Sequence, residues 1–125
     1  MENNKIYNLD CLEVLKTLPD NSIGMILQDP PYNTTPCKWE WDIMDKIEDF
    51  WREWTRVIKP NGAIVMTATQ PFSSKLVCSN LKMFKYEWIW NKVAARGWLR
   101  AKKRPMTKHE QILVFCEFPP RTIHK

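Results

Sequence analysis

Glycine is scarce in this sequence of 125 residues. Its three glycines, Gly24, Gly62 and Gly97, lie far apart, and each stands alone. Where a backbone approaches a ligand closely, it commonly relies on glycine, because a side chain would block the approach. The sequence therefore offers no glycine-rich turn that could cradle a ligand.

The four cysteines are scattered, and no long apolar run is present. Cys11, Cys37, Cys78 and Cys116 include no C-x-x-C pair. No signal peptide and no apolar run long enough to span a membrane is visible. We therefore expect free thiols, no structural metal and a cytoplasmic protein without membrane contact.

Acidic residues are missing from one stretch near the C-terminus, which carries seven basic side chains without an Asp or Glu between them: Lys92, Arg96, Arg100, Lys102, Lys103, Arg104 and Lys108. The chain as a whole has a net charge of +5. Both features favour a polyanionic partner such as nucleic acid. The alternative is a solvated surface loop with no partner.

The hydrophobic pattern predicts one α/β domain over residues 1–125. Strands are expected over 6–9, 23–27, 63–68, 86–90 and 111–115, with helices over 10–18, 45–58 and 71–83 between them. This alternation favours a mainly parallel sheet. A basic loop over 91–108 joins the last two strands without a helix, which favours an antiparallel edge strand, and 118–125 is an irregular tail. Trp51 and Trp54 fall on the apolar stripe of the second helix, so we expect both in the core.

Asp29-Pro30-Pro31-Tyr32 follows an apolar strand. In open α/β sheets, ligands bind beyond the carboxyl ends of the strands. Two prolines stiffen the backbone here, Asp29 offers an acceptor and Tyr32 an aromatic face. These groups suit methylation of an exocyclic amine, because acceptors help to localise the amine lone pair and stacking immobilises the base.

Several segments together resemble the β-group of amino-methyltransferases that act on adenine N6 or cytosine N4 of DNA, the phage and restriction–modification members above all. The resemblance runs in the family's order through residues 8–15, 26–33, 58–62, 70–72 and 108–115. It implies a Rossmann-like sheet, S-adenosylmethionine as cofactor, double-stranded DNA as partner and a prokaryotic or phage origin. An Asp at the first position of Asp29-Pro30-Pro31-Tyr32 resembles the adenine enzymes.

The resemblance also implies roles for single residues. Asp29 and the Pro30 backbone would accept hydrogen bonds from the target amine, Pro31 would hold the turn rigid, and Tyr32 would stack on the extruded base. Asp10, Cys11 and Asp29 would contact the cofactor. Position and charge give the residues expected at DNA: Asn33 and Trp39 follow the turn, and the basic stretch contains Arg96, Trp98, Arg100, Lys102, Lys103 and Arg104.

The sequence departs from the family in one respect, and plain alternatives stay open. The family's glycine-rich cofactor turn is missing, so the resemblance covers an N-terminal catalytic half with a partial sheet. That predicts a truncated product, a split enzyme completed by a second chain, or a fragment that dimerises. A catalytically inactive DNA-binding remnant and a methyltransferase for RNA or protein are the rival functions. Asp10 can also be read as a helix cap, with Glu13 as its capping-box partner.

Overall fold

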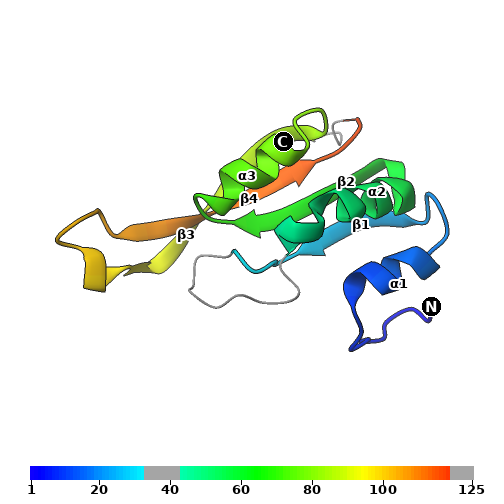
Figure 1. Cartoon of the computed structure of the whole chain (residues 1–125), viewed down its shortest axis with the longest axis horizontal. Coiled ribbons are helices and arrows are strands. Elements are labelled where there is room, and N and C mark those ends of the chain that lie inside the picture. Colours follow the sequence, from blue (N-terminus) through cyan, green and yellow to red (C-terminus); the bar gives the residue numbers. More distant parts are fainter. Residues whose placement is uncertain (33–42, 119–125) are drawn as a thin grey trace, which may run out of the picture.

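The structure, a computed structural model, describes residues 1–32 and 43–118 (Figure 1). Helices and strands alternate along most of the chain. The α-helices and strands are α1 (Cys11–Thr17), β1 (Ile23–Gln28), α2 (Ile47–Val57), β2 (Ile58–Ala68), α3 (Phe72–Ser79), β3 (Phe84–Arg96) and β4 (Thr107–Phe115). Two short 3-10 helices, η1 (Ile43–Lys46) and η2 (Trp98–Arg100), complete the set.

The four strands of the described residues form one mixed sheet in the order β1-β2-β4-β3. β1 pairs with β2 in parallel, and β4 pairs antiparallel with both β2 and β3. Three strands therefore run in one direction and β4 runs in the other. The expected α/β class and the antiparallel pairing of the last two strands are confirmed. The reversed strand β4 lies inside the sheet, and its partner β3 forms the edge.

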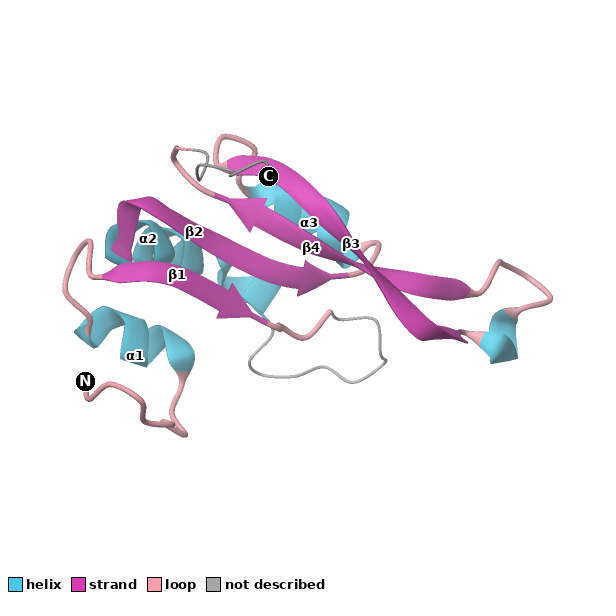
Figure 2. Ribbon diagram, turned by 180° about the vertical axis from the view of Figure 1, so that it is seen from behind, coloured by secondary structure: helices cyan, strands magenta, loops and turns pink. Residues whose placement is uncertain are grey.

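α2 and α3 cover one face of the sheet, as the views from the two sides show (Figures 1 and 2). Trp54 of α2, Met66 of β2 and Leu113 of β4 are fully buried between these layers. Burial of side chains of this size stabilises the fold by about 1.5–3 kcal/mol each. Trp51 is also buried, and its indole N–H donates to Ser79 Oγ at 2.7 Å. The core positions expected for Trp51 and Trp54 are confirmed.

The strand expected over residues 6–9 is wrong. This segment is irregular, and Ile6 and Leu9 are largely exposed. A strand needs a neighbour with which to exchange backbone hydrogen bonds. None of the strands in the described part of the chain pairs with residues 6–9.

β3 and β4 continue well beyond the helices as a hairpin that projects from the molecule (Figure 1). Ladder pairs extend to Asn91 with His109 and, beyond an irregularity, to Arg96 with Thr107. The basic loop expected over 91–108 is therefore shorter, 97–106, because the strands take up both of its ends. We call the segment 91–108 the arm. Residues 119–125 of the expected tail lie outside the described residues.

No helix of the described residues is long and apolar enough to cross a membrane. Within the same residues, no group of three or more His, Cys, Asp and Glu side chains is placed to hold a metal ion.

Candidate active site

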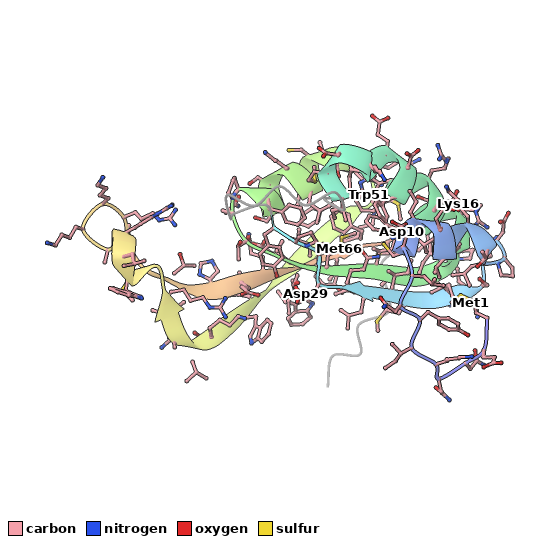
Figure 3. The ribbon with its side chains drawn as sticks, turned by 60° about the horizontal axis from the view of Figure 1, so that its bottom comes forward. Met1, Asp10, Lys16, Asp29, Trp51 and Met66 are labelled. Carbon is pink, nitrogen blue, oxygen red and sulfur yellow. The ribbon has the colours of Figure 1, made fainter. Side chains whose placement is uncertain are left out.

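Asp29, Pro30, Pro31 and Tyr32 leave the sheet directly after β1. Because neither proline has an N–H to donate, ladder pairing stops here. Pro30 is buried, which anchors the turn, while the neighbouring Asp29 is exposed. In Figure 3, Asp29 lies where the arm leaves the body of the sheet. The turn thus presents a carboxylate at the carboxyl end of β1.

Tyr32 connects this turn to two carboxylates. Its hydroxyl lies 3.1 Å from Asp29 Oδ1 and 3.3 Å from Glu110 Oε2, and the hydroxyl of Thr67 also donates to Asp29. Burial raises the pKa of the Tyr32 hydroxyl above its ordinary range, and the carboxylates of Asp29 and Glu110 raise it further. Tyr32 therefore stays protonated and acts as a donor. Its ring stacks on Phe72 of α3, with ring centroids 5.6 Å apart.

The two carboxylates differ in charge compensation. Glu110 forms an ion pair of 2.9 Å with Lys92 of β3. Asp29 has no ion-pair partner within the described part of the chain. The Asp29 carboxylate is thus available to an incoming hydrogen-bond donor that carries or gains positive charge.

A first cavity of about 710 Å³ lies on one side of the turn. Its lining includes Asp10, Cys11, Asp29, Pro30 and Pro31, so the three residues expected at the cofactor do come together. The further lining residues were not predicted from the sequence: Asn8, Leu9, Leu12, Gln28, Ile43, Lys46 and Phe50. Most of these missed residues belong to segments that were read only as secondary structure.

Asp10 caps α1, as the alternative interpretation of this residue as a helix cap predicted. Its Oδ1 accepts from the backbone N–H groups of Leu12 at 2.9 Å and Glu13 at 3.2 Å. The reciprocal half of the capping box does not form, because the Glu13 carboxylate pairs with Lys16 instead. The cap uses Oδ1 of Asp10, and no bond is made by its Oδ2 in the described residues. Burial, followed by the nearby Asp10 charge, raises the pKa of the Cys11 thiol, which favours the neutral thiol.

A second cavity of about 490 Å³ lies on the other side, at the base of the arm. Tyr32 lines it together with Arg96 and Arg104, two of the residues expected at DNA. Lys92, from the basic stretch, lines it too. The other lining residues were not predicted from the sequence: Thr69, Gln70, Gly97, Thr107, His109, Glu110 and Gln111. Glu110 had a usable signal, since it is the first acidic residue after the basic stretch.

The remaining residues expected at DNA lie elsewhere or are not described. Trp98, Arg100, Lys102 and Lys103 are exposed toward the tip of the arm and line neither cavity, and Trp98 is 72% exposed. Asn33 and Trp39 lie outside the described residues. The structure thus assembles the turn with Asp10 on one side and with Arg96 and Arg104 on the other.

Comparison with known proteins identifies relatives for nearly the whole chain. A family model described as DNA methylase matches residues 23–122. The type II methyltransferase M.BglII of Bacillus subtilis is 30% identical over 139 residues, which cover 93% of this chain and 36% of M.BglII. The chain spans between 36% and 50% of the length of the first three curated relatives it matches.

Solved structures share the fold. The cytosine-N4-specific PvuII DNA methyltransferase superposes with a TM-score of 0.70 at 16% identity, over 90% of this chain and 48% of its own. A DNA modification methylase from Thermus thermophilus, complexed with S-adenosyl-L-methionine, gives a TM-score of 0.63 at 23% identity, over 93% and 55%. At these identities the likeness shows a common architecture.

Proposed function

The chain belongs to the DNA methylase family, and on that premise we propose that it carries the base-handling part of a DNA amino-methyltransferase. The reaction transfers a methyl group from S-adenosylmethionine to the exocyclic amine of a base extruded from DNA. Adenine N6 is the proposed target, because Asp29 stands first in Asp29-Pro30-Pro31-Tyr32 as in the adenine enzymes that the sequence resembles.

One observation carries this proposal: Asp29-Pro30-Pro31-Tyr32 separates two cavities of different character. Asp29, Pro30 and Pro31 line the cavity that contains Asp10, and Tyr32 lines the cavity that contains Arg96 and Arg104. A group-transfer enzyme must hold donor and acceptor on either side of the reacting atoms. The turn lies between the two cavities, where the reacting atoms of donor and acceptor would meet.

The residues of the turn divide the handling of the base. Asp29 accepts a hydrogen bond from the target amine, and the Pro30 carbonyl is a second acceptor. Tyr32 stacks on the extruded base, an interaction worth about 1–3 kcal/mol. As the amine nitrogen becomes cationic, the uncompensated Asp29 carboxylate stabilises the charge. The proton leaves after transfer, so no strong general base is needed.

The first cavity fits the adenosine part of the cofactor. Leu9, Ile43 and Phe50 offer apolar surface for a flat ring, and Asp10 Oδ2 is open to a donor. The bound cofactor supplies an electrophilic methyl group on a sulfonium. Asp10 and the Cys11 backbone are the residues proposed to hold its adenine.

The arm is the proposed DNA contact. Arg96 and Arg104 lie beside Tyr32 in the second cavity, where they can hold phosphates that flank an extruded nucleotide. Trp98, 72% exposed near the tip, can stack or wedge between bases. Arg100, Lys102 and Lys103 add charge. Asn33 and Trp39 are proposed contacts because they follow the turn closely in the sequence.

A second chain is the proposed partner at the β1 edge. β1 pairs with β2 alone among the described strands. Its Met25 and Leu27 are 60% and 67% exposed. An open, apolar strand edge favours pairing with another chain. We propose a partner that carries the missing glycine-rich turn, with a second copy of this chain as the alternative that sedimentation would reveal.

Calorimetric titration of S-adenosylmethionine into the folded chain, with and without duplex DNA, tests the proposal, followed by tritiated-methyl transfer to DNA. Cofactor binding with methyl incorporation supports a transferase complete in this chain. Salt-dependent DNA binding without cofactor binding supports the need for a partner, and then adding the partner must restore transfer. A folded chain that binds neither DNA nor cofactor would contradict the proposed function.

A further inference from the structure

Glu110 is a nearly buried carboxylate that the proposed reaction does not use. It lies on β4 and is 9% exposed. Its Oε1 lies 2.9 Å from Lys92 Nζ, and its Oε2 lies 3.3 Å from the Tyr32 hydroxyl. A carboxylate that is this deeply buried needs a charged partner, but a buried ion pair often adds little to the net stability of the fold. Its position against Tyr32 suggests a task at the site.

The Lys92–Glu110 pair is held by neighbouring strands. Trp90 and Glu110 stand directly opposite each other in the β3–β4 ladder, and Lys92 lies two residues along. The Lys92 ammonium lies 3.7 Å from the centroid of the Trp90 ring, a cation–π contact. Lys92 is therefore fixed from two sides, and it fixes Glu110 in turn.

Tyr32 gains two separate supports from this arrangement. Phe72 stacks on its ring, and Glu110 accepts from its hydroxyl. The hydroxyl carries one hydrogen, so it donates to either Glu110 or Asp29 at a time, and without Glu110 it could donate only to Asp29. Asp29 is also the carboxylate that must accept a hydrogen bond from the target amine. Without Glu110, the Tyr32 hydroxyl and the amine would therefore compete for the same acceptor.

We propose that Glu110, held by Lys92, is a positioning residue that keeps the Tyr32 ring in its base-stacking orientation and leaves Asp29 to the target amine. This inference rests on the proposed function, since it assumes that a base stacks on Tyr32. Glu110 acts through the Tyr32 hydroxyl and does not touch the base. Removing the Glu110 carboxylate should therefore have the same effect on base stacking as removing the Tyr32 hydroxyl, and removing both groups should add little.

The test measures how much a central base adds to the binding of a single-stranded oligonucleotide. Fluorescence anisotropy gives Kd for a labelled nine-nucleotide thymidine strand with adenine, cytosine or an abasic sugar at its centre. The base increment is the abasic Kd divided by the lower of the two base Kd values. We expect about tenfold for the wild type, as stacking on an aromatic ring provides.

Glu110→Leu and Tyr32→Phe should each reduce the increment to about twofold or less, and the double variant should lose no more. Glu110→Gln keeps an acceptor oxygen and should recover most of the increment. Glu87→Leu is the matched control: this exposed carboxylate of β3 bonds Gln111 and lines neither cavity. Denaturant unfolding checks that each variant is folded, and if Glu110→Leu is not, Tyr32→Phe decides alone.

The inference is overturned if Glu110→Leu or Tyr32→Phe keeps the full increment, or if the two losses multiply in the double variant. A wild type that binds every strand without a base increment would instead overturn the base pocket of the proposed function. A wild type that binds no strand would overturn the DNA contact, and this inference with it.

Discussion

Strands β3 and β4 run through both the helix-covered part of the sheet and the projecting arm, yet the two regions differ in burial and in charge. Where α2 and α3 cover the sheet, Leu113 and Phe115 of β4 are fully buried. In the arm, Val93 is 99% and Leu99 80% exposed, and every Asp, Glu, Lys or Arg position is basic. The candidate site lies where the two regions meet. The comparison suggests that stability resides in the first region and DNA contact in the second.

The largest effect is expected from breaking the covered region. Trp54 is fully buried, and its ring centroid lies 5.1 Å from that of Phe50 and 5.0 Å from that of Trp51. Trp54→Ala should therefore lower the free energy of unfolding by about 3–5 kcal/mol. Trp98→Ala, in the arm, should change it by less than about 0.5 kcal/mol. Urea denaturation compares the two, and equal losses would contradict the division between the regions.

Asp29, at the junction, should affect chemistry and leave the fold intact. Asp29→Asn removes the charge that stabilises the cationic amine, so methyl transfer by the complete enzyme should fall about 100-fold. Because Asp29 is exposed, the free energy of unfolding should change by less than about 1 kcal/mol. Tritiated-methyl incorporation and urea denaturation measure the two effects. Unchanged transfer would remove Asp29 from the reaction.

Two substitutions of Asp10 distinguish its structural role as the cap of α1 from its proposed role in cofactor binding. Asp10→Ala loses the cap of α1 and should cost about 1 kcal/mol of stability. Asp10→Asn keeps a capping oxygen and should retain nearly all of it. If Asp10 also binds the cofactor through its charge, both variants should weaken cofactor affinity in calorimetry. Asp10→Asn with unchanged affinity would leave Asp10 as a cap alone.

The smallest effects are expected for single charges of the arm. Arg100→Ala and Lys103→Ala should each weaken binding to duplex DNA of any sequence and reduce the slope of log Kd against log salt by about one. Their unfolding free energies should stay within about 0.5 kcal/mol of the wild type. Lys16→Ala on α1 is the control, since Lys16 already pairs with Glu13. A similar loss of slope in Lys16→Ala would mean that the contact is not localised to the arm.

Local patterns in the sequence predicted the covered region well. The stripe of α2 placed Trp51 and Trp54 inward, and the apolar run before Asp29 marked β1, because periodicity and proline act over a few residues. The end of β1 at Asp29-Pro30-Pro31-Tyr32 was predicted for the same reason. The strand expected over 6–9 failed because strands need partners, which local pattern does not supply.

Contacts between distant segments were beyond reach of the same reasoning. Tyr32 and Glu110 are 78 residues apart, and nothing in the sequence around either one indicates the other. The lengths of β3 and β4 were underestimated because Val93 and its neighbours do not alternate between apolar and polar, although Arg96 still pairs with Thr107 beyond an irregularity. The role of Asp10 as a helix cap was predicted, because it depends on neighbouring residues alone. The second cavity was not, because it depends on how β3 and β4 pack beside the turn at residues 29–32.

A crystal structure of the folded chain with the nine-nucleotide thymidine strand that carries a central adenine tests the central claim most directly. The account predicts the adenine ring stacked on Tyr32 in the cavity beside Arg96, with its N6 about 3 Å from an oxygen of Asp29. An adenine bound away from Tyr32, with no contact between its amine and the turn, would contradict it.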